Sequence, residues 1–355
     1  MSNQVKAFGT EAKDKPLEQI TIERREVTAK DIEIDILYCG VCHSDLHTAK
    51  NDWGGTVYPS VPGHEIVGKI TKVGSDVTKL KVGDYAAVGC MVDSCQTCNS
   101  CKQDLEQYCL NGFTGTYNGK DKHLGGRTFG GYSEKVIVDE NFVLKVPKNL
   151  ADSNLAAVAP LLCAGVTTWS PLVHWNVKKG SKVAVIGLGG LGHMAIKLAK
   201  GMGADVTLFS RSPSKEKDAK ELGADTVIIS TDESQMKSVR GNFDLIIDTV
   251  PYEHNLNPYI STLSINGTLV LVGFIGELDS MLKTPTMIMG RRSVAGSVIG
   301  GIKETQEMLD FCGKHNIVSE IEEIKMQEIN EAYERMLKSD VRYRFVIDMK
   351  SLKNH

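Results

Sequence analysis

The chain has 355 residues, 41% of them apolar and 24% charged, and its formal net charge is −3. This composition is typical of a globular protein with a sizeable core, and the length suits two domains of about 150 residues each. The charge balance gives no electrostatic reason to expect a nucleic-acid or anionic-membrane partner.

No signal-peptide pattern opens the chain, and no stretch approaches the roughly 18 apolar residues of a membrane span. We therefore expect a cytoplasmic protein with no membrane partner. In that compartment the nine cysteines stay reduced and are available as metal ligands.

The first region, residues 1–152, is rich in glycine and in short β-type runs. Examples are Ile32–Leu37, Ile66–Ile70 and Val136–Val138, and turn residues separate them. This pattern predicts an irregular, mostly-β domain.

Two motifs in this region carry metal-ligand residue types. One contains Cys42 and His43 and continues to His47, and the other contains His64 and Glu65. A third candidate, Cys163, comes much later in the chain. A Cys, His and Cys set would leave a fourth coordination position open, as a catalytic zinc requires. Spacing alone does not assemble residues so far apart.

A cluster of four cysteines lies at residues 90–110. Its members, spaced C-x2-C-x2-C-x7-C, are Cys95, Cys98, Cys101 and Cys109. Four thiolates can close a tetrahedral zinc site, so the spacing predicts a structural zinc lobe. An iron–sulfur cluster is the alternative. Acidic neighbours such as Asp104 and Glu106 argue against a nucleic-acid-binding zinc ribbon.

The second region, residues 153–295, alternates apolar strands with helix-length segments. The predicted strands are Lys182–Ile186, Val206–Phe209, Thr226–Ile229, Leu245–Ile247 and Thr268–Val272. Helices are predicted over Met194–Gly201 and Ser214–Leu222. This alternation predicts an α/β domain with a doubly wound parallel sheet.

A glycine-rich turn follows the first of these strands and opens a helix. In that context G-x-G-x-x-G predicts a dinucleotide site, with the pyrophosphate at the helix N-terminus. Gly187 permits the tight turn, Gly189 lets the pyrophosphate approach, and Gly192 allows close helix–strand packing. The expected cofactor-binding residues here are Gly187, Gly189, Gly190, Leu191 and Gly192.

The next strand ends without the acidic residue that usually binds the ribose 2′-hydroxyl of NAD. Ser210, Arg211, Ser212 and Lys215 stand there instead. Hydroxyls and cations suit a 2′-phosphate, so we predict NADP(H). The alternative is a solvated loop in which a serine caps the following helix.

The last region, residues 296–355, contains two predicted helices and a late strand. The helices are Ile302–His315 and Ile329–Lys338, and the strand is Tyr343–Ile347. We expect this strand to return to the first domain and complete it.

Taken in order, these motifs resemble the zinc-containing medium-chain alcohol dehydrogenases, and within them the NADP-dependent cinnamyl alcohol dehydrogenase group. The matching segments include GVCHSDLH, GHE, the four-cysteine lobe, LLCAGVTTWSPL, GLGGLGHMAIKLAK and DVRYRFVIDM. The resemblance implies a Rossmann domain plus a GroES-like catalytic domain, and one catalytic and one structural zinc ion. It also implies hydride transfer between NADP(H) and primary alcohols or aldehydes, cinnamaldehyde among them.

The resemblance also assigns roles to single residues. Cys42, His64 and Cys163 match the catalytic zinc ligands. Glu65 matches a glutamate beside the zinc that is thought to exchange into the ligand sphere. Asp45 matches the carboxylate that orients the ligand histidine.

Further matches concern protons and cofactor. Ser44 and His47 match a relay that carries the alcohol proton through the cofactor ribose to solvent. His43 matches a cofactor-phosphate contact, and Thr167 matches a contact on the nicotinamide side. A homodimer is expected, because pairing of sheets across subunits is usual in the family.

Alternative functions remain. A polyol dehydrogenase commonly has Glu in place of Cys163 and often lacks the complete lobe. A zinc-free quinone reductase would lack the Cys42, His64 and Cys163 set. A catalytically silent zinc- and nucleotide-binding protein would lack a ligand or a relay residue, and none is missing here. NADP(H) use favours aldehyde reduction as the direction.

Several other residues lie outside the motifs described above. Trp53 and Tyr117 line the substrate pocket by analogy with the family's loops, with ordinary core packing as the alternative. Cys90 is expected to be a small apolar packing residue, like Cys39 and Cys312. His254 is expected to be structural or exposed.

Overall fold

The computed structural model describes residues 3–273, 276 and 281–353. The chain divides into two compact units: one runs to Cys163 and resumes at Gly300, and the other is Ala164–Ile299. The sequence boundaries lay at residues 152 and 295. The first differs because the helical segment η4 (Ala156–Leu162) contacts strands of the first unit.

Within the described residues, no single helix is long and apolar enough to cross a membrane. Only a bent pair, η4 together with α3 (Ala164–His174), meets the length and composition of a span.

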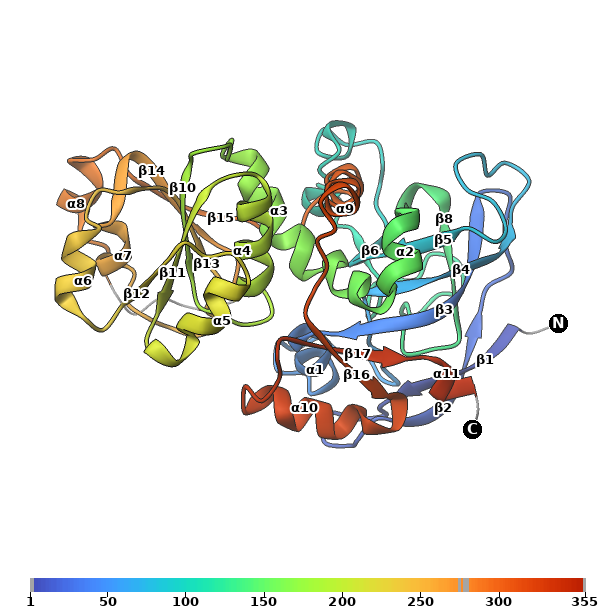
Figure 1. Cartoon of the computed structure of the whole chain (residues 1–355). Helices are drawn as coiled ribbons and strands as arrows, with labels where there is room; N and C mark the ends of the chain where they lie inside the picture. The colour runs from blue at the N-terminus through green and yellow to red at the C-terminus, as the bar shows by residue number, and fades with distance from the viewer. Residues whose placement is uncertain (1–2, 274–275, 277–280, 354–355) are drawn as a thin grey trace. The chain divides into compact units, whose positions relative to one another are not determined.

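The second unit is built on a parallel sheet (Figure 1) whose strand order is β12-β11-β10-β13-β14-β15. This is the doubly wound dinucleotide-binding order, so the predicted α/β fold class is confirmed. The strands are β10 (Lys182–Ile186), β11 (Asp205–Ser210), β12 (Thr226–Ile229), β13 (Phe243–Asp248), β14 (Leu263–Leu271) and β15 (Ser293–Gly296).

Helices lie on both faces of this sheet. Figure 1 shows α4 and α5 on one face and α6 and α7 on the other. The helical elements after α3 are α4 (Gly192–Gly201), η5 (Pro213–Lys215), α5 (Glu216–Glu221), α6 (Glu233–Ser238), α7 (Asn257–Ile260) and α8 (Thr284–Ile288). Strand β15 was not predicted, because its four residues form no apolar run and are only partly buried.

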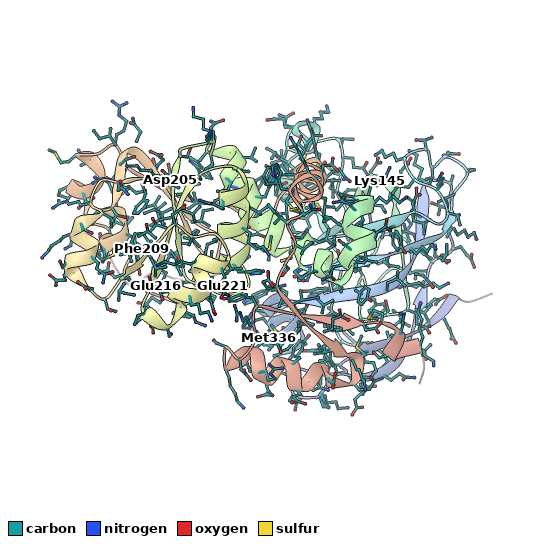
Figure 2. The ribbon with its side chains drawn as sticks, in the orientation of Figure 1. Lys145, Asp205, Phe209, Glu216, Glu221 and Met336 are labelled. Atoms are coloured by element: carbon teal, nitrogen blue, oxygen red, sulfur yellow. The ribbon has the colours of Figure 1, made fainter. Side chains whose placement is uncertain are left out.

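The core of this unit packs around aromatic rings at the centre of the sheet. Phe209 lies in β11, and its ring centroid is 5.4 Å from that of Phe243 in edge-on geometry. Figure 2 labels Phe209 inside this unit, and Glu216 and Glu221 at the exposed ends of α5. Burial of the central strands explains why they read as continuous apolar runs.

The first unit contains a sheet in the order β16-β17-β3-β4-β5-β9, with β8 also pairing with β3, and two smaller sheets, β1-β2 and β6-β7. Its longer strands are β1 (Asn3–Gly9), β2 (Glu18–Arg24), β3 (Asp31–Val41), β4 (Ile66–Val73), β5 (Tyr85–Val88), β8 (Lys135–Asp139), β16 (Ile321–Lys325) and β17 (Arg344–Asp348). The short strands are β6 (Met91–Asp93), β7 (Thr114–Gly115) and β9 (Leu144–Lys145).

The helical elements of the first unit are short, apart from two near the C-terminus. The α-helices are α1 (His43–Ala49), α2 (Lys148–Asn154), α9 (Ile302–His315), α10 (Ile329–Leu337) and α11 (Lys350–Lys353). The 3-10 segments besides η4 are η1 (Cys101–Gln103), η2 (Glu106–Tyr108), η3 (Glu140–Phe142) and η6 (Met326–Glu328).

The late strand β17 joins the sheet of the first unit. It pairs antiparallel with β3, and Phe345 lies opposite Val41. The chain therefore returns from the second unit to the first, as the sequence predicted for the strand near residue 345. This register brings Arg344 level with the end of β3, where Cys42 follows.

Arg24 fixes the segment that precedes β8. Its guanidinium donates from Nε to the Lys135 carbonyl at 2.9 Å, and from its terminal nitrogens to the carbonyls of Phe129 and Gly130 at 2.8 and 2.9 Å. A fourth bond, at 2.6 Å, goes to Ser133 Oγ. Burial lowers the pKa of Arg24 to about 10, so the side chain stays charged at neutral pH.

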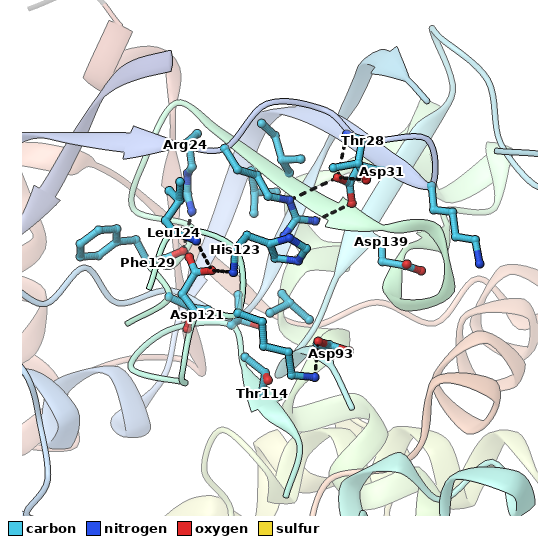
Figure 3. Close-up of a pocket in the computed structure, with 18 of the residues that line it drawn as sticks. Arg24, Thr28, Asp31, Asp93, Thr114, Asp121, His123, Leu124, Phe129 and Asp139 are labelled. Carbon is cyan, nitrogen blue, oxygen red and sulfur yellow. Dashed lines mark hydrogen bonds and ion pairs between the residues drawn. The ribbon is translucent and has the colours of Figure 1, made fainter. Parts of the chain in front are cut away.

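Arg24 and Phe129 also line a cavity of about 510 Å³ (Figure 3). Two ion pairs lie in its lining, Arg25 with Asp31 at 2.5 Å and Lys122 with Asp93 at 2.6 Å. None of the site residues predicted from the sequence lines it.

We predict that Arg24→Met lowers the free energy of unfolding by about 3 kcal/mol, because several acceptors lose their buried donor. Chemical denaturation of the purified protein measures this. Lys30→Met, which removes an exposed cation at the same cavity, is the control and should change stability by less than about 0.5 kcal/mol. Equal stability of the Arg24 variant and the control would contradict the role given to Arg24.

Candidate active site and metal centres

The turn from β3 into α1 fixes Cys42 and Asp45 together. Cys42 is the N-cap of α1 and has an extended backbone, with φ −115° and ψ 154°. Its backbone N–H donates to Asp45 Oδ2 at 2.9 Å. A carboxylate at this helix position satisfies a free N–H at the helix start. The C-x-x-D spacing thus fixes both side chains locally.

Asp45 also holds His64, which comes from a distant part of the chain. The Asp45 Oδ1 atom lies 2.9 Å from His64 Nδ1 and accepts the Gly63 N–H at 3.0 Å. Tyr132 donates its hydroxyl to Oδ2 at 3.2 Å. Because a carboxylate accepts, the proton of His64 lies on Nδ1, and Nε2 is left as a ligand atom.

Four potential ligands converge at this point. One ligand atom from each of Cys42, His64, Glu65 and Cys163 lies within 4.8 Å of every other, and all four residues are buried. The Cys42 and Cys163 sulfurs are 3.9 Å apart. A tetrahedral zinc with bonds of about 2.3 Å separates two sulfurs by about 3.8 Å, so this pair fits one ion.

The electrostatics of the cluster favour a thiolate at Cys42. The hydrogen bond from Cys163 lowers the pKa of the Cys42 thiol well below its usual value, which favours the thiolate that metals bind. Burial raises the pKa of Glu65 to about 8, against the opposing effect of Arg344. Among the described side chains, Glu65 Oε2 has no hydrogen-bond partner.

Gly40 makes room for this glutamate. A Cβ at Gly40 would lie 1.9 Å from Glu65 Oε2, so only glycine allows the carboxylate to lie here. The other oxygen, Oε1, pairs with the buried Arg344. Glu65 is therefore held beside the thiols by its own cation.

Ser44 and His47 lie on α1 next to the cluster. Ser44 Oγ is 3.7 Å from Cys42 Sγ. His47 lies one helical turn later and contacts Asp52 through Nδ1 at 2.8 Å. The ring of Trp53 is 5.1 Å from that of His47, and Tyr117 packs 5.5 Å from the ring of His64. Both aromatic residues therefore adjoin predicted site residues.

The four lobe cysteines form a second cluster. The sulfurs of Cys95, Cys98, Cys101 and Cys109 all lie within 4.8 Å of one another. Cys98 and Cys101 are 3.5 Å apart, and Cys95 and Cys101 are 3.9 Å apart, which suits one tetrahedral ion. Backbone N–H groups of Thr97 and Cys98 lower the pKa of Cys95 to about 5, so a thiolate is ready.

The glycine-rich turn has the predicted geometry in the second unit. Gly187 has φ +90°, a conformation that favours glycine. A Cβ at Gly192 would lie 2.1 Å from the Gly187 carbonyl oxygen, so glycine is required for close packing. A Cβ at Gly189 would meet no atom within 4 Å, so the described protein does not fill this space. Gly190 and Leu191 complete the turn before α4.

The residues after β11 form a hydroxyl-rich turn. Ser210 Oγ donates to the Ser212 carbonyl at 2.8 Å, and Ser212 Oγ accepts the Ser214 N–H at 3.2 Å. Ser212 is thus the N-cap of η5. Arg211 and Lys215 are exposed on either side. The capping alternative is observed, and it leaves both cations available.

The remaining predicted residues are placed separately. His43 is exposed at the start of α1 in the first unit, and Thr167 is buried in α3 of the second unit. Apart from His43, the predicted cofactor residues all belong to the second unit.

Sequence reasoning missed several residues of the first cluster. Arg344 stands in the closing RYRF motif, and Tyr132 stands in GGYSEK, but no spacing rule ties either to His64. Asp52 carried no motif. Cys90 was interpreted as an apolar packing residue; its thiol instead lies beside Cys163 and contacts the Leu162 carbonyl at 3.7 Å. The sequence carried no signal of this neighbour, because the contact is tertiary.

Comparisons with known proteins agree with this geometry. Residues 28–148 match the family described as "Alcohol dehydrogenase GroES-like domain", and residues 190–314 match "Zinc-binding dehydrogenase". The chain is 51% identical to the aldehyde reductase YahK of Escherichia coli (strain K12) over 348 residues, covering 98% of this chain and 99% of that protein.

Two further relatives cover almost the full length. NADP-dependent alcohol dehydrogenase C 1 of Mycolicibacterium smegmatis is 52% identical over 351 residues, 99% of each chain. The crystal structure of a Helicobacter pylori CAD complexed with NADP(H) matches with a TM-score of 0.90 and 44% identity, covering 99% of each chain.

The chain therefore belongs to the zinc-containing medium-chain alcohol dehydrogenase family and is an enzyme of that family. Its relatives include proteins named as NADP-dependent alcohol dehydrogenases and aldehyde reductases. The two clusters supply the donor sets for a four-cysteine zinc site and for a zinc site of Cys, His and Glu type.

We predict about two zinc ions per chain. Cys98→Ser should remove the lobe ion, and Cys42→Ala should remove the other, because each variant lacks one ligand. Elemental analysis of the purified protein measures both. Cys312→Ala, which changes a buried thiol outside both clusters, should keep two ions. Iron or acid-labile sulfide in the lobe would overturn the zinc assignment.

We predict that Asp45→Asn weakens zinc binding at the buried site by about 10- to 100-fold, because the histidine loses its charged partner. Competition with a chromogenic chelator measures this affinity. The lobe ion in the same sample is the internal control and should not change. Equal weakening of both ions would mean that the variant loosens the whole unit, and an unchanged affinity would mean that Asp45 does not tune His64.

Proposed function

We propose that this enzyme transfers hydride between NADP(H) and primary alcohols or aldehydes, with cinnamaldehyde-type and aliphatic aldehydes as substrates and reduction as the preferred direction. The observation that carries the proposal is the buried convergence of Cys42, His64 and Cys163 with Glu65 beside them. Three protein ligands leave one coordination position for substrate oxygen, in contrast to the closed four-cysteine lobe.

When bound, the zinc ion supplies Lewis-acid polarisation of the substrate oxygen, and the nicotinamide supplies or accepts the hydride. The residues that would hold the ion are Cys42, His64 and Cys163, and Glu65 is the one positioned to exchange with them. The hydrogen bond that His64 donates to Asp45 keeps the imidazole oriented while substrates enter and leave.

The proton path is assigned to Ser44 and His47. Ser44 Oγ lies beside Cys42 Sγ, so a substrate oxygen in the open position would be within its reach. The Nδ1 atom of His47 faces the Asp52 carboxylate and carries a proton, which leaves Nε2 to accept or release one. This arrangement supports general acid–base catalysis in which His47 exchanges protons with solvent.

The cofactor preference rests on the end of β11. Ser210, Arg211, Ser212 and Lys215 supply hydroxyls and cations, and no acidic residue stands among positions 210–215. Such a turn suits a 2′-phosphate and lacks the carboxylate that would bind an unmodified ribose. The glycine-rich turn would hold the pyrophosphate, and Thr167 would contact the nicotinamide. The family resemblance assigns His43 as a further contact to a cofactor phosphate.

We also propose a homodimer. Strand β15 is at the edge of the parallel sheet, and an unpaired edge is a template for pairing with a second copy. The neighbouring Ile288 and Met289 are 74% and 85% exposed, which supports burial of this edge in an assembly. No disulfide joins any of the nine cysteines in the described part of the chain, which supports the cytoplasm as the compartment.

We expect chelator-sensitive reduction of cinnamaldehyde, with NADPH preferred over NADH. A steady-state assay with each cofactor, with and without a zinc chelator, measures both properties. Preference for NADH would contradict the cofactor assignment and leave the dehydrogenase assignment intact. Failure across a broad panel of aldehydes, with zinc and NADPH bound, would favour a silent binding protein.

A further inference from the structure

A contact between a buried carboxylate and a partly buried histidine fixes the loop that follows β13. Asp248, the last residue of β13, is fully buried, and its Oδ2 lies 2.9 Å from His254 Nε2. The contact is an ion pair rather than a well-aligned hydrogen bond. The other oxygen of Asp248 accepts the Val250 N–H at 3.1 Å.

Both ring nitrogens of His254 face oxygen atoms. Its Nδ1 lies 2.9 Å from the Tyr252 carbonyl oxygen and its Nε2 lies 2.9 Å from the Asp248 carboxylate, a setting that favours the imidazolium over the neutral ring. The contact with Asp248 raises the pKa of His254, in agreement with this geometry. Removing His254 would leave the Asp248 carboxylate buried without a counter-charge.

The same histidine ties the loop to the end of β11. The ring centroid of His254 is 6.1 Å from that of Tyr259, which lies 5.2 Å from that of Phe209. Ser210 follows Phe209 directly. The loop after β13 and the turn after β11 are therefore fixed relative to each other through one aromatic cluster.

Tyr252 lies on this loop and contacts Arg211. The Arg211 guanidinium donates to the Tyr252 hydroxyl at 3.3 Å, and its carbon lies 5.7 Å from the ring centroid. Both side chains are exposed, Tyr252 to 51%. Among the described residues, no carboxylate lies within ion-pair distance of Arg211. Its remaining N–H donors are thus available to an anion.

We propose that Tyr252 is the platform that orients the Arg211 guanidinium toward the adenosine 2′-phosphate, and that the Asp248–His254 ion pair holds this platform in place. The proposal rests on the NADP(H) preference proposed above and names its positioning residues. An arginine held on an aromatic face loses less conformational freedom when it binds phosphate, so the platform strengthens binding only where a 2′-phosphate is present.

The test uses two probes that differ only in the 2′-phosphate, adenosine 2′,5′-bisphosphate and 5′-AMP. Their affinities for the full-length protein are measured by calorimetry. Tyr252→Ala should weaken the bisphosphate about fivefold and leave 5′-AMP within about twofold. Tyr252→Phe retains the ring face and should recover part of the loss.

His254→Gln tests the ion pair. It should lower the affinity for the bisphosphate and leave that for 5′-AMP nearly unchanged. Adding Tyr252→Ala to this variant should cause little further loss, because both substitutions remove the same support of Arg211. Ile265→Ala is the control: this residue is 74% exposed in the same unit and should leave both affinities unchanged.

Two results would overturn the inference. Equal weakening of both probes by Tyr252→Ala would assign Tyr252 to adenosine binding in general, and an unchanged bisphosphate affinity would mean that Arg211 needs no platform. If the unsubstituted protein itself showed no preference for the bisphosphate, the NADP(H) preference would fail as well. A bisphosphate preference in the unsubstituted protein that Tyr252→Ala leaves undiminished would overturn this inference alone. If His254→Gln does not fold, the exposed Tyr252 variants decide the question.

Discussion

The Asp45 carboxylate is the contact on which the buried metal cluster depends. It accepts the Cys42 N–H at the start of α1, the Gly63 N–H and the Nδ1 proton of His64. The Tyr132 hydroxyl adds a further donor. One side chain thus joins two ligands of the cluster, and both of its buried oxygens accept hydrogen bonds, whereas a buried carboxylate without such partners would be costly.

Hydrogen bonds, an ion pair and strand pairing hold together the segments around Asp45. Arg24 fixes the segment from Phe129 to Lys135, which carries Tyr132 to Asp45. Strand β17 pairs with β3 and brings Arg344 to Glu65, while Gly40 leaves space for the glutamate. Cys42, His64 and Glu65 therefore each have a protein partner that orients them, which is the condition for a preorganised metal site.

In the second unit, too, contacts between separate segments hold the predicted binding residues in place. Its parallel strands end in turns whose backbone N–H groups and side chains are suited to phosphates. The turn after β11 and the loop after β13 come from separate crossovers, yet Phe209, Tyr259 and His254 fix them together. A histidine that carried no motif in the sequence thereby becomes part of the proposed 2′-phosphate site.

The sequence by itself determined the fold class and the local motifs. The strands Lys182–Ile186 and Thr226–Ile229 and the helix Ile302–His315 lie where their patterns predicted, because the hydrophobic period acts over a few residues. The C-x2-C-x2-C-x7-C lobe and the glycine-rich turn are also local, so their spacing alone predicted their geometry. The short edge strand β15, with no apolar run, escaped prediction.

Only the tertiary structure decided which distant residues meet. Strand pairing and loop packing bring together four pairs of residues that no sequence spacing relates. These pairs are Arg344 with Glu65, Tyr132 with Asp45, Cys90 with Cys163 and Tyr252 with Arg211. The family resemblance supplied Cys42, His64 and Cys163 as a set, whereas the partners that orient and charge them became visible only in the fold. Contacts between residues that are remote in sequence depend on how the whole chain packs, so a local sequence pattern does not predict them.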